Sequence, residues 1–194
     1  MTSKPNRPRP AYHAYLIRCW TTPAQPNCRS PDHQRFVVET ISDQPRRLDP
    51  HGTRSGVFYI SPNAGPSALA GKGCHENYFN VAWQNDNLHE AAGAYASDAA
   101  FQNAFIMAPN YPAGQDALTG YKRTFDGDLA GEIFTQLGQT DYAAEIAQIR
   151  ASGADSVFFF LPGGMGIAFM KQYAESGVDI PLVGPAFSFD QGIL

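Results

Sequence analysis

From residue 56 onward, short apolar runs alternate with longer amphipathic ones, and this pattern restricts the fold more than any other feature of the sequence. The short runs are rich in β-branched and aromatic residues, which is typical of buried strands. We expect strands at residues 56–60, 78–83, 103–107, 129–135, 156–161 and 180–183. We expect helices from Asp86 onward and at residues 113–125, 141–152 and 165–176. Strands alternating with helices of about 12 residues predict an α/β fold with a parallel, doubly wound sheet.

The spacing within the helices indicates which face each one buries. Four apolar residues of the first helix follow helical spacing and are expected to face the sheet: Leu88, Ala91, Ala92 and Tyr95. Gly153 and Gly177 are expected to end the last two helices, because glycine accepts the left-handed backbone that a helix end often needs.

The first 55 residues differ from the rest in charge and in turn residues. They carry nine Lys or Arg and four Asp or Glu, whereas residues 56–194 carry five and fourteen. They also hold eight of the 15 prolines but one of the 18 glycines. A basic segment can bind nucleic acid or an anionic membrane, but this one lacks a helix-turn-helix pattern, and its composition fits a solvated, poorly folded stretch better. One strand is a candidate here, at residues 35–38.

The three cysteines do not predict a metal site. Cys19 and Cys28 are separated by eight residues, unlike the short ligand pairs of zinc sites, and beyond His33 no fourth ligand is evident. The odd number leaves at least one thiol unpaired within the chain, and Cys74 stands in a Gly-rich loop. Neither a metal nor a cofactor is expected. The opening residues do not resemble a signal peptide, and no apolar run is long enough to span a bilayer.

Ligands of an open α/β sheet bind beyond the carboxyl ends of its strands. Four loops are expected there, at residues 61–65, 109–114, 162–166 and 184–187. They contain neither a Ser–His–Asp set nor a base beside a nucleophile, so they predict no catalytic site, and we do not expect an enzyme.

Other residues in or near these loops carry groups that could bind a cofactor or a ligand. The glycines at residues 163–166 lack the third small residue of a dinucleotide fingerprint, since Phe169 occupies that position. His75 and His89 lie outside the loops and are expected at the surface. Three aromatic residues lie at or near strand ends, where they could stack on a small organic ligand or simply pack: Trp83, Tyr111 and Phe187.

Several motifs, in order, resemble those of the leucine/isoleucine/valine-type periplasmic binding proteins. VFYISPNAGP at residues 57–66 resembles their Ile-Ser-Pro-x-Ala strand and loop, and MAPNYPAG at residues 107–114 resembles the Tyr-containing loop of their second lobe. TDYAAEI at residues 140–146 and DSVFFF at residues 155–160 resemble later elements of that lobe. The resemblance runs from Gly56 to Leu194 and implies the type I fold, in which two Rossmann-like lobes close on a ligand by a hinge motion.

The resemblance implies a division of the chain into three segments. Residues 1–55 form an irregular, basic, Pro-rich segment, residues 56–85 a remnant of the first lobe with the crossover, and residues 86–194 a nearly complete second lobe. The first lobe is then mostly missing. We hypothesise that a reading-frame shift or a wrong start produced residues 1–55, and the other frames of the coding DNA would show whether the alternation continues there.

The resemblance also implies a function and a set of ligand contacts. The chain would be the substrate-binding component of an ABC importer of the branched-chain amino-acid class, with a small-molecule ligand, a membrane permease as partner, the periplasm as location and no nucleic acid. The contacts implied in the two lobes are Asn63, Ala64, Gly65, Tyr111, Pro162 and Phe187. Two alternatives stay open: a cytoplasmic ligand-sensing regulator of the same fold, and a non-functional truncated product.

One departure from the family points to the kind of ligand. Amino-acid binders of this family hold the ligand ammonium with an acidic residue near the positions of Ala186 and Phe187, which are apolar here. Asp190 could take that place only after a small loop shift. Because a buried ammonium without a partner is costly, we hypothesise that the ligand is a carboxylate without the amine, plausibly aromatic.

Overall fold

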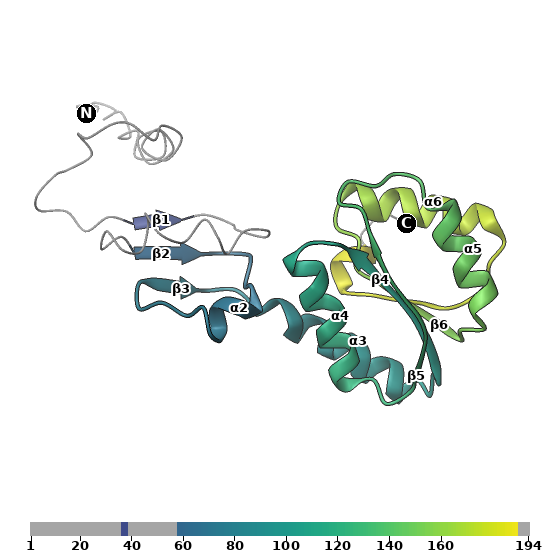
Figure 1. Cartoon of the computed structure of the whole chain (residues 1–194), viewed down its shortest axis with the longest axis horizontal. Helices are drawn as coiled ribbons and strands as arrows, with labels where there is room; N and C mark the ends of the chain where they lie inside the picture. The colour runs from purple at the N-terminus through teal and green to yellow at the C-terminus, as the bar shows by residue number, and fades with distance from the viewer. Residues whose placement is uncertain (1–35, 39–57, 190–194) are drawn as a thin grey trace, which may run out of the picture.

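A computed structural model describes residues 36–38 and 58–189, which form two parallel sheets joined by the crossover between them (Figure 1). The first sheet contains three strands and a short helix: β1 (Phe36–Val38), β2 (Phe58–Ser61), α2 (Ser67–Ala70) and β3 (Tyr78–Asn80). The second unit contains four strands, four α-helices and a 3-10 turn: α3 (Asn85–Asp98), β4 (Asn103–Pro109), α4 (Pro112–Thr124), β5 (Asp128–Thr135), α5 (Ala143–Ser152), β6 (Ser156–Phe159), α6 (Gly164–Ser176), β7 (Leu182–Val183) and η3 (Ala186–Phe189).

The first sheet has the order β1-β2-β3, with both neighbouring pairs parallel. The candidate strand at residues 35–38 is therefore confirmed as β1, which adds at least these three residues of the basic segment to the sheet. The strand expected at residues 78–83 ends at Asn80, and the chain then crosses to α3. Tyr59 and Tyr78 hold β2 and β3 together on one face, with stacked rings 5.7 Å apart between centroids.

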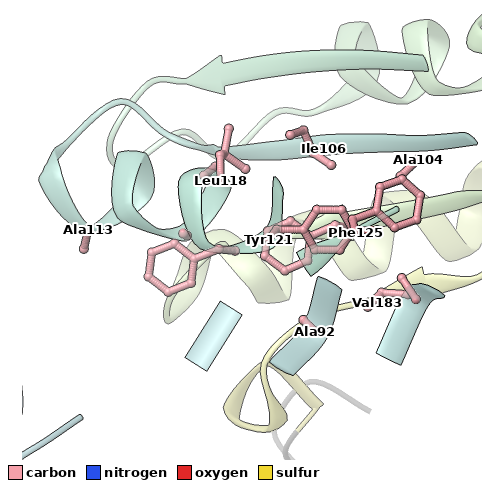
Figure 2. Close-up of a cluster of buried hydrophobic side chains, with 13 residues drawn as sticks. Ala92, Ala104, Ile106, Ala113, Leu118, Tyr121, Phe125 and Val183 are labelled. Atoms are coloured by element: carbon pink, nitrogen blue, oxygen red, sulfur yellow. The ribbon is translucent and has the colours of Figure 1, made fainter. Parts of the chain in front are cut away.

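The second sheet has the order β5-β4-β6-β7, and all of its pairs are parallel. Alternate side chains of β4 point to opposite faces: Ala104, Ile106 and Ala108 lie in the core with α3 and α4, whereas Phe105 and Met107 lie in the core with α5 and α6. Figure 2 shows the first of these cores. Helices on both faces of a parallel sheet confirm the predicted doubly wound fold.

The buried face of α3 differs from the one predicted. Leu88 is 36% exposed and Tyr95 62% exposed, and Ala91 is exposed too. The buried residues of the helix are Asp86, His89, Ala92, Gly93 and Ala96. The face turned toward the protein is therefore lined by small and polar side chains, because α3 packs closely against α4 and leaves little room for large ones.

Two glycines allow this close packing of α3 on α4. A methyl group added at Gly93 would overlap the carbonyl oxygen of Tyr121, and one added at Gly120 would overlap the carbonyl oxygen of Asp86. Each helix thus places a glycine against the backbone of the other. Two side-chain bonds cross the same contact: the Thr124 hydroxyl donates to the Glu90 carbonyl (2.6 Å), and the Ser97 hydroxyl donates to the Thr124 carbonyl (3.2 Å).

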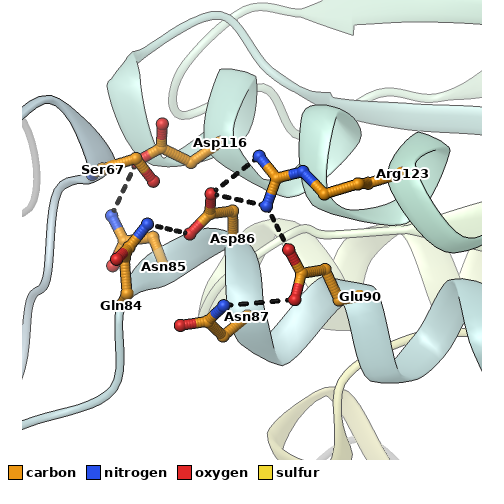
Figure 3. A network of polar contacts seen from close by, with 8 residues as sticks. All are labelled: Ser67, Gln84, Asn85, Asp86, Asn87, Glu90, Asp116 and Arg123. Carbon is orange, nitrogen blue, oxygen red and sulfur yellow. Dashed lines mark hydrogen bonds and ion pairs between the residues drawn. The ribbon is translucent and has the colours of Figure 1, made fainter. Parts of the chain in front are cut away.

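Arg123 adds an ionic link between the two helices. Both terminal nitrogens of its guanidinium donate to one oxygen of the Asp86 carboxylate at 3.1 Å, and it also pairs with Glu90 (Figure 3). Burial alone would raise the pKa of the Asp86 carboxyl, but the hydrogen bonds that it accepts, among them those from Arg123 and Gln84, outweigh burial and leave the pKa below its usual value. Asp86 is therefore a buried, charged partner for Arg123.

We predict that Gly93→Ala and Gly120→Ala each lower the free energy of unfolding by about 1–3 kcal/mol, since the added methyl groups meet rigid backbone carbonyls. Gly164→Ala is the matched control, because it is also a helical glycine but has no atom within 4 Å of the added carbon. Chemical denaturation of the three variants measures the effect. Equal stability of all three would show that the helices do not need this close approach.

Candidate functional site

Three aromatic rings meet at the carboxyl end of the second sheet. The ring of Tyr111 stacks on that of Phe160, with 6.3 Å between centroids and 12° between planes. Phe187 meets the same Phe160 ring edge-on, at 6.0 Å and 82°. Phe160 is buried, Tyr111 half-buried and Phe187 49% exposed. We call these three residues the aromatic platform; it has a buried centre and an accessible rim.

The topology of the sheet explains why these residues meet. Tyr111 follows β4, Phe160 follows β6 and Phe187 follows β7, and these three strands are neighbours in the sheet. Because parallel strands end at the same edge, residues distant in sequence come together there. Tyr111 also caps α4, whose first residue is Pro112, so its backbone is extended (φ −153°, ψ 169°) just where the helix begins. The prediction that Tyr111 and Phe187 lie at strand ends is confirmed.

Phe160 is the member of the platform that the sequence analysis did not single out. It ends the apolar run of residues 156–161, so it was interpreted as part of a buried strand. Its place could have been inferred from strand alternation, because Phe160 points to the same side of the sheet as Phe158. Both rings lie in the core with α3 and α4, and Tyr111 caps α4.

The described strand-end segments that carry the platform are uncharged. The described strand-end segments at residues 109–111, 160–164 and 184–189 contain no Asp, Glu, Lys or Arg. Most of the polar groups in these segments belong to the backbone. Among the side chains, the buried Ser188 hydroxyl has no hydrogen-bond partner among the described residues. Asp190 lies outside the described residues. A ligand that touches only these described segments would therefore meet rings, uncharged polar side chains and backbone amides.

His89 lies directly behind the platform, and the expectation that it is a surface residue is wrong. Its side chain is 2% exposed, and its ring meets those of Phe160 at 4.8 Å and Phe158 at 5.8 Å, edge-on in both cases. Burial lowers the pKa of His89 from 6.5 to about 4, against a smaller opposing effect of the Asp86 carboxylate. His89 is thus a neutral imidazole at neutral pH. His89 lies three residues after the buried Asp86, so both side chains lie on one face of α3. This spacing could have indicated that His89 is buried.

The predicted first-lobe loop follows β2 and has a defined internal structure. The Ser61 hydroxyl donates to the Ala64 carbonyl at 2.5 Å, which closes a short turn. Asn63 is exposed, whereas Ala64 and Gly65 are buried. Gly65 exchanges two hydrogen bonds with Asn85: the Asn85 amide N–H donates to the Gly65 carbonyl (2.8 Å), and the Gly65 N–H donates to Asn85 Oδ1 (3.1 Å). The loop is therefore tied to the start of α3.

The remaining predicted contacts are dispersed. Pro162 is half-buried two residues beyond Phe160, whereas the Trp83 side chain, in the crossover, is 73% exposed. A hollow of about 200 Å³ lies in the first lobe. It is lined by Gly65, Pro66, Leu69, Ala70, Tyr78, Asn80 and Gln84. Of the predicted contacts it thus includes Gly65, and no member of the aromatic platform lines it.

The described residues offer no metal site. They contain no group of three His, Cys, Asp or Glu side chains placed to hold a metal ion. Cys74 is exposed with a free thiol, while Cys19, Cys28 and His33 lie outside the described residues. Across residues 58–189, every helix is too short or too polar to cross a bilayer.

Comparisons with known proteins agree with this architecture. A sequence model of the family described as "Periplasmic binding protein" matches residues 32–194, and so begins ahead of the resemblance found at Gly56. The chain is 31% identical to Leu/Ile/Val-binding protein homolog 6 of Brucella melitensis over 87 residues, which are 43% of this chain and 22% of the relative. The chain thus spans about a fifth of the length of that curated relative.

Two solved structures from ABC transporters are also similar. One is a solute-binding protein of R. palustris in complex with benzoate, with a TM-score of 0.73 and 25% identity over 80% of this chain and 44% of that one. The other is a solute-binding protein of Rhodopseudomonas palustris BisB5 in complex with 3,4-dihydroxy benzoic acid, with a TM-score of 0.65 and 26% identity over 73% of this chain and 40% of that one.

We predict that His89 makes the protein sensitive to acid. Between pH 6.5 and 4 the unfolded chain binds a proton at His89 that the folded chain does not, so the free energy of unfolding should fall as the pH falls through this range. The loss attributable to His89 should reach about 3 kcal/mol. Chemical denaturation at several pH values from 7 to 4 measures this loss. His89→Phe should flatten the dependence of the free energy of unfolding on pH, and His75→Gln serves as the control that leaves it unchanged. An unchanged slope in His89→Phe would contradict the assignment.

Proposed function

Because this chain belongs to the periplasmic binding protein family, we propose that it serves as the solute-binding component of an ABC importer and binds a small aromatic carboxylate. The observation that carries the choice of ligand is the aromatic platform of Tyr111, Phe160 and Phe187, which lies at a strand-end edge with no charged side chain in the described segments.

The platform suits the ring of such a ligand. A benzoate-like ring can stack on the half-buried Tyr111 or meet the exposed part of Phe187, while Phe160 and His89 keep these rings in place from behind. An aromatic pair of this kind contributes about 0.5–1.5 kcal/mol beyond the burial of its area. An aliphatic side chain such as that of leucine would be stabilised there by burial of its apolar surface, but it would lack the additional energy of a contact between two aromatic rings.

The described strand-end segments contain no acidic side chain, which argues against an α-amino acid as the ligand. An ammonium group taken out of water needs a charged or polar partner, and without one the free energy of binding is strongly unfavourable. Ala186 and Phe187, near the positions where the family's amino-acid binders carry an acidic residue, are exposed and apolar. A ligand without an amine has no such requirement.

The carboxylate of the ligand would be held by backbone N–H groups. Helix α6 begins at Gly164 directly after Gly163, whose φ of 63° turns the chain at the helix start. The first N–H groups of a helix have no partner within it and favour an anion. The loop at residues 63–65 would add polar groups from the first lobe, as the family resemblance implies.

The similar proteins are consistent with this ligand class. Two of the solved structures contain benzoate and 3,4-dihydroxy benzoic acid, and both proteins belong to ABC transporters. By the same reasoning we propose that the protein acts in the periplasm and delivers its ligand to a membrane permease. This chain spans less than half of either solved chain, so the transport role is proposed for the whole protein.

We predict that the chain binds para-fluorobenzoate weakly, since it spans less than half of the similar solved chains. Binding should broaden the fluorine NMR line of that compound, and benzoate should reverse the broadening while leucine at the same concentration does not. Phe187→Ala should weaken binding by about tenfold, the loss of one aromatic contact with its burial. Phe134→Ala is the matched control, since Phe134 is 42% exposed on β5 and outside the platform. Stronger competition by leucine than by benzoate would refute the proposed ligand class.

A further inference from the structure

The two lobes are joined by a small hydrogen-bonded cluster around Asp116 (Figure 3). One oxygen of this carboxylate, Oδ2, accepts a bond from the backbone N–H of Ser67 at 3.1 Å and another from the Asn85 side-chain amide at 3.2 Å. Ser67 is the first residue of α2 in the first lobe, whereas Asp116 lies in α4 of the second. The carboxylate therefore holds the backbone of one lobe from a helix of the other.

Asn85 extends this cluster to the predicted ligand loop. Its side-chain oxygen accepts from the Gly65 N–H, its backbone N–H donates to the Gly65 carbonyl, and its side-chain nitrogen donates to Asp116. The oxygen of the Asn85 side-chain amide thus accepts from one partner, and its nitrogen donates to another. These two bonds fix the orientation of the amide. A displacement of Asp116 would therefore be transmitted to Gly65 through a single rigid side chain.

Gly65 itself has no room to move toward the crossover. A methyl group added there would overlap the carbonyl oxygen of Trp83 and the side-chain nitrogen of Asn80. The loop is consequently held on one side by close backbone contact and on the other by the bonds of Asn85. Its neighbour Ala64 is fixed in turn by the Ser61 hydroxyl.

Helix α4 connects this cluster to the aromatic platform. Tyr111 caps the helix and stacks on Phe160, and Asp116 follows five residues later in the same helix. Farther along, Arg123 binds Asp86 and so holds α4 against α3. Helix α4 therefore carries both a ring of the aromatic platform in the second lobe and the carboxylate that holds the first lobe.

We propose that Asp116 is a positioning residue for the ligand site: by holding Ser67 and Asn85 it sets the place of the loop at residues 63–65 relative to Tyr111. The effect on binding rests on the proposed function, since it assumes that both elements contact the ligand. The effect on the arrangement of the lobes does not depend on any ligand. Asp116 need not touch the ligand for either effect.

Two variants remove the bonds in different ways. Asp116→Ala deletes the acceptor, and Ser67→Pro deletes the N–H donor at the first position of a helix, where proline is well tolerated. Pro66 already has the extended backbone (φ −56°, ψ 127°) that a residue before proline favours. Ser67→Ala is the matched control, because it removes the hydroxyl but keeps the N–H that Asp116 binds.

The arrangement of the lobes is measured first, in the full chain without ligand. One spin label is attached to the exposed Cys74 in the first lobe and a second to Lys171→Cys, at an exposed position of α6, with Cys19→Ser and Cys28→Ser to avoid further labels. We expect the distance distribution between the labels to widen in Asp116→Ala and Ser67→Pro and to stay unchanged in Ser67→Ala. Unchanged distributions in both bond-deleting variants would overturn the proposal.

Binding of para-fluorobenzoate is then compared in the same variants. We expect Asp116→Ala and Ser67→Pro to weaken it by about tenfold and Ser67→Ala to leave it unaltered. A wider distribution with undiminished affinity would overturn the positioning role. If the unmodified chain does not bind para-fluorobenzoate, the proposed ligand class fails, and the spin-label distances alone decide the role of Asp116.

Discussion

The contact between α3 and α4 is the constraint on which the rest of the structure depends. Gly93 and Gly120 let each helix approach the backbone of the other, and the Arg123–Asp86 ion pair fixes their relative position along the contact. Helix α3 follows directly from the crossover, so this contact fixes where the crossover enters the second lobe. Without the two glycines, the helices would have to separate, and the bonds between Arg123 and Asp86 would lengthen.

The position of α4 has consequences at both ends of the helix. At its start, Tyr111 reaches the carboxyl edge of the sheet, where Phe160 and Phe187 complete the aromatic platform. One turn later, Asp116 binds the first lobe. Behind the platform, His89 of α3 supports Phe160 as a neutral ring. The candidate ligand surface is thus an outcome of how two helices pack, and its polarity follows from the apolar strand ends that surround it.

Most helices and strands of residues 58–189 could be predicted because each carries its own pattern, and Gly153 ends α5 with a φ of 72°, as expected. The short α2 and η3 were missed, because four residues are too few to show a helical period. The buried face of α3 could not be predicted, because close packing on α4 selects small residues there and leaves Leu88 outside. For the same reason His89 was missed. In the site, Tyr111 was predicted, whereas Phe160 looked like ordinary core. All predicted ligand contacts stay predictions: Asn63, Ala64, Gly65, Trp83, Tyr111, Pro162 and Phe187.

The central claim is that the uncharged strand ends select a ligand that has a carboxylate and a ring but no ammonium. The most direct test is to introduce the missing charge with Ala186→Glu, at an exposed position beside Phe187. Fluorine NMR titrations should show para-fluorobenzoate binding weakened by at least about tenfold and leucine binding gained, since the new carboxylate repels one ligand and pairs with the other. Ala151→Glu, exposed near the end of α5, should change neither. If Ala186→Glu binds para-fluorobenzoate as well as the unmodified chain does, the account is contradicted.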